Sequence, residues 1–183
     1  MKQTIPALPI IAAFSGLVGA QIDQPLRIDV SGYEFRDGLG DADNMVFELF
    51  VGALWEIDWI EWNLNLTTLT APGNSFPSWG SEAHIDFNGQ IDLQVSNTSD
   101  GVINENNAGF AIMEDYLGGP LTLASDGIFR MEFYETFVDS PGIADAVLGE
   151  GSWIRIPVQG PTPGPLAAMG LGGLFAAKRR RIR

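Results

Sequence analysis

Apolar and polar residues alternate along most of the chain between residues 21 and 158, and this period of two restricts the fold most. Successive side chains of a strand point to opposite faces, so alternation is typical of a strand with one buried face. No window of ten or more residues has the period of an amphipathic helix. We expect strands in the eight segments where the alternation is clearest: Ile28–Val30, Met45–Val51, Leu54–Trp62, Leu64–Leu66, His84–Phe87, Ile91–Val95, Ile128–Tyr134 and Trp153–Val158.

Turn-rich segments separate these strands, and Gly, Pro, Asn and Asp recur in them. They cover residues 36–44, 70–82, 96–107 and 135–151. Many short strands joined by such loops predict an all-β domain, an antiparallel β-sandwich or jelly roll over residues 21–158. Within the last loop we expect Ile143–Leu148 to form one helical turn.

The charge of this central part excludes several classes of partner. Residues 21–160 contain four arginines, no lysine and all 23 acidic residues of the chain, which gives a formal net charge of −19. Such a surface repels nucleic acid and anionic membranes, so we expect no nucleic-acid partner. It suits a secreted domain, or one that collects divalent cations. The chain has no cysteine, which excludes disulfides and thiolate chemistry.

The first twenty residues have the pattern of a secretory signal peptide. Lys2 supplies a positive start, and an apolar stretch follows from Ile5 to Val18. Small residues before Gln21 give a cleavage site between Ala20 and Gln21. We therefore expect residues 1–20 to form a signal helix that signal peptidase removes.

Residues 159–183 read as a linker followed by a sorting signal. The apolar run Pro165–Ala177 is thirteen residues long. As a helix it would reach only about 20 Å, less than the roughly 30 Å hydrocarbon core of a bilayer. A basic cluster ends the chain, and we expect it to stay on the cytoplasmic side of the inner membrane: Lys178, Arg179, Arg180, Arg181 and Arg183. The alternative is a basic disordered tail or nucleic-acid patch, but the apolar run directly before the cluster argues against it.

This tail resembles the PEP-CTERM sorting signal of exopolysaccharide-producing Gram-negative bacteria. Pro161, Thr162, Pro163 and Gly164 stand where that family has Pro-Glu-Pro, so the glutamate is replaced and the form is similar to a Pro-Thr-Pro-Gly variant. The resemblance covers about the last 23 residues. It implies processing by an exosortase-like membrane protease and transient insertion in the inner membrane. It also implies a location at the cell surface, in the outer envelope or in extracellular matrix, with a structural or polysaccharide-associated role.

The string Glu56-Ile57-Asp58-Trp59-Ile60-Glu61 resembles the Glu-x-Asp-x-x-Glu motif of laminarinase-like family-16 glycoside hydrolases. The resemblance implies a nucleophile at Glu56, an assisting group at Asp58 and a general acid/base at Glu61. Retention needs two carboxyls about 5–5.5 Å apart, and a β-bulge at Trp59–Ile60 would bring Glu61 onto the face of the other two. The alternatives are a non-catalytic carbohydrate-binding module, or an ordinary strand whose acids face water.

The loop Asp37-Gly38-Leu39-Gly40-Asp41-Ala42-Asp43-Asn44 offers hard oxygen ligands, so Asp37, Asp41 and Asp43 are candidate Ca²⁺ ligands. The order is not that of an EF-hand. A second oxygen-rich candidate is the segment 97–107, and either loop could be an ordinary turn. Among the five tryptophans, Trp79 in a Pro-Ser-Trp-Gly loop is a candidate surface for stacking on sugars.

Overall fold

Strand β5 (Trp59–Thr68) is the centre of the largest sheet in a computed structural model that describes residues 25–138 and 140–157. One side of β5 pairs with β8 (Glu105–Ile112). The other side pairs with β12 (Trp153–Ile156) and β11 (Ala146–Leu148). The sheet ends in two short strands, β1 (Leu26–Asp29) beside β12 and β2 (Glu34–Phe35) beside β11, and every pairing is antiparallel.

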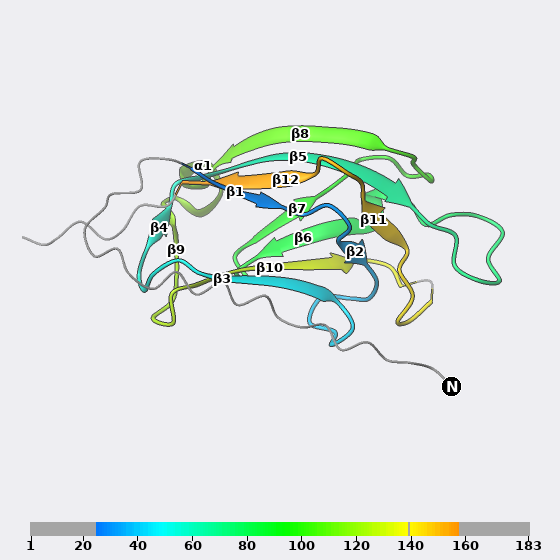
Figure 1. The fold of residues 1–183 in the computed structure, drawn as a ribbon, viewed down its shortest axis with the longest axis horizontal. Helices are drawn as coiled ribbons and strands as arrows, with labels where there is room; N and C mark the ends of the chain where they lie inside the picture. Colours follow the sequence, from blue (N-terminus) through cyan, green and yellow to red (C-terminus); the bar gives the residue numbers. More distant parts are fainter. Residues whose placement is uncertain (1–24, 139, 158–183) are drawn as a thin grey trace, which may run out of the picture.

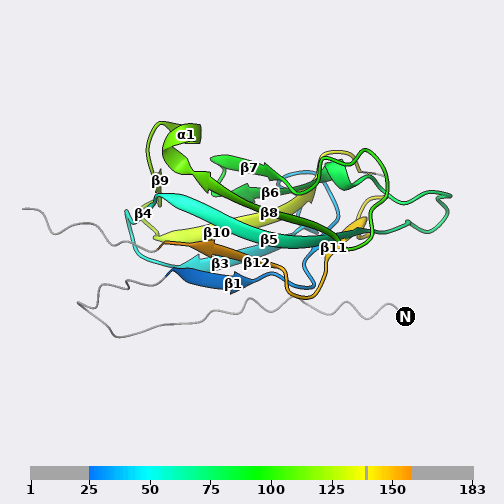
Figure 2. The ribbon, with the colours of Figure 1, turned by 90° about the horizontal axis from the view of Figure 1, so that it is seen from above.

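A second antiparallel sheet faces the first (Figures 1 and 2). Its strand order is β3 (Met45–Phe50), β10 (Ile128–Glu135), β6 (Ala83–Phe87) and β7 (Ile91–Gln94). A small third sheet pairs β4 (Glu56–Ile57) with β9 (Leu121–Thr122). The helical elements of the described residues are the short helix α1 (Met113–Leu117) and the 3₁₀ turn η1 (Gly80–Glu82). The prediction of an all-β, antiparallel domain is confirmed.

Both main sheets contribute side chains to one hydrophobic core. Alternate residues of β5 and β10 point inward, so Leu64, Leu66, Phe129 and Phe133 are fully buried. Phe133 lies at the centre of an aromatic group, with its ring centroid 4.6 Å from that of Tyr33 and 5.8 Å from that of Phe35. The alternation of the sequence therefore corresponds to burial of one face of each sheet.

Strands β8 and β11 of the large sheet differ from the sequence prediction, and β2 lies where no strand was predicted. Residues 146–148 form β11 rather than part of a helical turn, because hydrogen-bonding strands lie on both sides of them. Strand β8 begins inside a segment predicted to be a loop, because its less exposed positions, Glu105, Asn107, Gly109 and Ala111, are polar or small and give no apolar alternation. Its Gly109 lies under the indole of Trp62, where any Cβ would overlap the ring.

The chain changes its buried face at Asp58. Ile57 and Ile60 are both buried although three positions separate them, which a continuous strand does not allow. The change arises because β4 ends at Ile57 and β5 begins at Trp59, each with a different partner strand. It is therefore a break between two strands rather than the expected bulge at Trp59–Ile60.

Strand β1 begins and β12 ends at the same end of the large sheet, because Leu26 is opposite Ile156 in the register. The loops after β5 lie at the opposite end (Figure 1). The predicted signal segment with its Ala20–Gln21 cleavage site, the motif Pro161–Gly164, and the basic cluster of residues 178–183 lie outside the described residues. No helix of residues 25–138 and 140–157 is long and apolar enough to cross a membrane.

Candidate functional site

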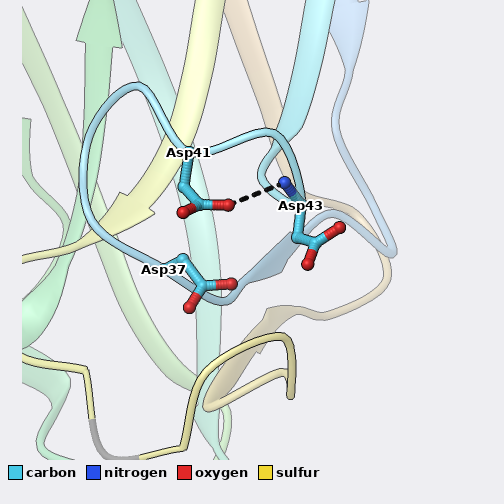
Figure 3. A group of neighbouring side chains, drawn as sticks. All are labelled: Asp37, Asp41 and Asp43. Carbon is cyan, nitrogen blue, oxygen red and sulfur yellow. Dashed lines mark hydrogen bonds between the residues drawn. The ribbon is translucent and has the colours of Figure 1, made fainter.

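The three aspartates predicted to bind a cation come together on one loop. The ligand oxygens of Asp37, Asp41 and Asp43 lie within 4.8 Å of one another, and Figure 3 shows them on the loop between β2 and β3. Asp41 and Asp43 are exposed, whereas Asp37 is only 5% exposed. We call residues 37–44 the aspartate loop.

Asn44 and Glu132 hold the aspartate loop in place. The side-chain amide of Asn44 donates to the Gly38 carbonyl at 2.8 Å and to Glu132 Oε1 at 2.9 Å. The same Asn44 side chain accepts the backbone N–H of Asp37 at 3.0 Å. Glu132 Oε1 also accepts the N–H of Gly40 at 2.6 Å. The loop is thus fixed to the outer face of β10.

Asp37 joins the aspartate loop to a second loop. Its carboxylate accepts the backbone N–H of Gly142, at 3.1 Å to Oδ1 and 2.9 Å to Oδ2. Its backbone carbonyl accepts the N–H of Glu135 at 2.9 Å. These bonds explain how a carboxylate is accommodated at a buried position, because buried charges need hydrogen-bond partners.

Among the described residues, no cationic side chain forms a salt bridge with the three aspartates. Within residues 25–138 and 140–157, every salt bridge joins other groups, such as Arg130 to Glu132 and Arg36 to Glu34. Two unit charges 4.8 Å apart repel by about 0.9 kcal/mol in water and by about 3.5 kcal/mol at an effective dielectric constant of 20. Carboxylate oxygens are the preferred ligands of Ca²⁺. A divalent cation would therefore both fit the donor set and relieve its repulsion.

Sequence reasoning identified the three aspartates but missed the two residues that position their loop. The sequence pattern indicated only that Asn44 is part of a turn and that Glu132 is an outward residue of a strand. The available signal was a pair of charged residues, Arg130 and Glu132, within the otherwise apolar run Ile128–Tyr134. The second oxygen-rich segment is used differently, since Glu105 accepts the hydroxyls of Ser96 at 2.7 Å and Thr98 at 3.0 Å.

The candidate catalytic carboxylates lie on different elements. Glu56 is on β4, Asp58 in the link to β5, and Glu61 on β5. The Glu61 carboxylate accepts the Nε–H of Arg155 at 2.8 Å and forms a salt bridge with that side chain. Among the described residues the aspartate loop holds the one group of three acidic ligands within 4.8 Å, so these three carboxylates do not form such a group.

The tryptophans near these carboxylates have other contacts. Trp62 covers Gly109 and donates to Asn107 Oδ1 at 3.1 Å. Trp59 packs against Phe110 with ring centroids 5.4 Å apart. Trp79, by contrast, is 52% exposed. Of these three tryptophans, Trp79 has the most open position.

His84 belongs to a cluster of polar side chains on β6, β7 and β10. His84 Nδ1 lies 2.9 Å from Asp92 Oδ2, and the hydroxyl of Tyr134 donates to Asp92 Oδ1 at 2.9 Å. Asp86 is the cross-strand partner of both Asp92 and Glu132. Burial, followed by the neighbouring charges of Glu132 and Asp92, raises the pKa of Asp86 above its ordinary value despite a hydrogen bond from Gly89.

Comparisons of the chain with protein-family models, with curated proteins and with solved structures found no match. Its function is therefore inferred from its own residues and their geometry.

Proposed function

We propose that this chain is a non-catalytic protein exported to the cell surface, outer envelope or extracellular matrix. In this proposal it is built on an antiparallel β-sandwich and associates with polysaccharide. Signal peptidase removes residues 1–20, and an exosortase-like protease acts on the tail that resembles a PEP-CTERM signal. The tail pattern and the absence of lysine from the strongly acidic central part support export. The shared core of the two main sheets supports the sandwich architecture.

In this proposal the domain binds Ca²⁺ at Asp37, Asp41 and Asp43. The observation that carries this proposal is the gathering of three carboxylates within 4.8 Å on a loop with no salt-bridge partner among the described residues. Ca²⁺ takes six to eight oxygen ligands in flexible geometry. Because Asp37 also binds Gly142, a cation would reinforce the junction between two loops.

A calcium titration followed by thermal unfolding tests this proposal. We expect the midpoint Tm to rise with millimolar Ca²⁺ and to return after chelation, because a ligand that binds only the native state stabilises it. An equal rise with Mg²⁺ would indicate general screening of the acidic surface. An unchanged Tm would refute calcium binding.

Mass spectrometry of native material tests the proposal on export. We expect a mature N-terminus at Gln21 and loss of the basic cluster. A deletion of residues 178–183 should change the size or location of the product. Detection of the intact chain in the cytosol would refute processing at both ends. The salt bridge between Glu61 and Arg155 favours the non-catalytic proposal over the hydrolase alternative.

A further inference from the structure

An open groove of about 630 Å³ is lined by residues 73–79 together with Glu82 and Phe137. It is formed by the loop that follows β5 and by the segment that follows β10. The loop after β5 lies at the end of the domain opposite to the start of β1 and the end of β12 (Figure 1). We call this feature the distal groove.

Three exposed aromatic side chains line the distal groove. Phe76 is 79% exposed, Phe137 is 61% exposed and Trp79 is 52% exposed. Single exposed apolar residues are common on proteins, but several aromatic rings gathered in one hollow mark a binding surface. The hydrophobic core is complete without them, so these rings are not needed to hold the two sheets together.

Backbone hydrogen bonds fix the turn η1, which directly follows Trp79. The N–H of Gly80 donates to the Asp100 carbonyl and that of Ser81 to the Thr98 carbonyl, each at 2.9 Å. Pro77 packs against Gly101, where a Cβ would overlap its ring. Trp79 is held by its own turn, since its N–H donates to Glu82 Oε2 at 3.2 Å. A ring on a preorganised backbone loses little conformational entropy when a ligand binds.

Phe137 lines the same groove from the segment that follows β10. The N–H of Thr136 donates to the carbonyl of Glu82 at 3.0 Å, which places the end of β10 beside η1. Aromatic surfaces therefore come from two separate segments of the chain. This arrangement can contact an extended ligand at more than one place.

The chemistry of the lining fits a neutral sugar chain. The ring of a sugar has faces of C–H groups that pack on aromatic rings, and hydroxyl groups at its edge that donate and accept hydrogen bonds. The groove combines three aromatic rings with the amide of Asn74 and the hydroxyl of Ser75. None of the described residues that line it is basic, and the central part of the chain has a formal charge of −19, so an anionic polysaccharide would be repelled.

We propose that the distal groove binds a neutral polysaccharide, with Phe76, Trp79 and Phe137 as its stacking surfaces. This inference rests on the proposed association with polysaccharide and specifies its site and the class of ligand. The proposed membrane signal follows β12, and the groove lies at the other end of the domain. A chain held at its C-terminal end would thus present the groove away from the membrane.

Affinity electrophoresis of the full-length protein tests the site. The gels contain a soluble β-glucan, a galactomannan or the anionic polysaccharide alginate. We expect retardation by at least one neutral polymer and none by alginate. Trp79→Ala and Phe76→Ala should each weaken the apparent Kd about tenfold or more, which corresponds to about 1.4 kcal/mol. Tyr116→Ala is the matched control, because Tyr116 is an aromatic residue of α1 that is 67% exposed.

The possible results distinguish a failure of the proposed binding site from a failure of the proposed association with polysaccharide. Equal retardation of wild type and both groove variants would overturn the site and leave the association with polysaccharide intact. No retardation of the wild type by any neutral polymer would overturn both. Retardation by alginate alone would contradict the charge argument and with it the assigned ligand class. Circular dichroism spectra and Tm values equal to those of the wild type would show that the variants are folded.

Discussion

Replacing Asp43 by Asn should have opposite effects on stability without and with calcium. Asp43 is exposed, and its carboxylate lies within 4.8 Å of those of Asp37 and Asp41. At that separation each pair costs about 0.9 kcal/mol in a water-like medium. Two pairs, reduced for solvent screening, amount to about 1 kcal/mol. In the presence of a chelator, Asp43→Asn should therefore raise Tm by about 3–4 °C for a domain of this size.

With calcium the order of the two proteins should reverse. At a free Ca²⁺ concentration of 100 times Kd the wild type gains about 2.7 kcal/mol, or about 10 °C in Tm. The variant has lost one of three carboxylate ligands, so it should gain less than half as much. Differential scanning calorimetry in chelator and in millimolar Ca²⁺ measures both effects. Asp115→Asn, which removes one exposed charge from α1 far from the aspartate loop, is the control and should show no reversal.

Two results would refute this reasoning. Equal calcium-induced rises for wild type and Asp43→Asn would show that Asp43 is not a ligand. A fall in Tm for the variant in chelator would show that repulsion in the cluster does not destabilise the folded state.

Three further predictions concern the core, the outer face of the second sheet and the alternative active site. Phe133→Ala should lower the free energy of unfolding by about 3–5 kcal/mol in a urea titration, because a fully buried ring is lost and a cavity remains; a loss below about 1 kcal/mol would contradict the assigned packing. The raised pKa of Asp86 means that the native state binds more protons than the unfolded chain between the two pKa values, so its stability falls as pH rises through that range. Asp86→Asn should then raise Tm at pH 7 and leave it nearly unchanged below pH 3. The corresponding gain in the free energy of unfolding is at most about 1 kcal/mol, because the group is partly exposed. Reducing-sugar assays on β-glucans should detect no release by the wild type, and release that disappears in Glu56→Gln would establish the hydrolase instead.

The regular strands were predictable from sequence because burial of one face requires apolar and polar residues to alternate along the strand. Strands β3, β6, β7, β10 and β12 all lie where alternation predicted them. Strand β8 shows no such alternation, because its less exposed positions include Glu105 and Asn107, and Gly109 is covered by Trp62. The strand β11 depends on partners distant in sequence, so its apolar residues could equally indicate a helical turn.

Only the three aspartates of the candidate site were predictable from sequence. Local spacing shows that Asp37, Asp41 and Asp43 share a loop, and the structure brings their oxygens together. The residues that hold the loop could not be found in this way, because Glu132 lies about ninety positions further along the chain. The contribution of Phe137 to the distal groove was not predictable, because Phe137 is distant in sequence from the loop after β5. Trp79 was predictable as a candidate because it lies in a Pro-Ser-Trp-Gly loop.

The place of β12 between two other strands has a mechanical consequence. Four of its residues are in register with β1 and three with β5, so β12 is an inner strand of the sheet. A force applied to the chain beyond residue 157, along the direction of β12, would act in shear on the pairings of β12 with β1 and with β5. The hydrogen bonds of both pairings would have to break together. Tension would then be borne by β1, β12 and β5, and the loops at the far end would keep their shape under load.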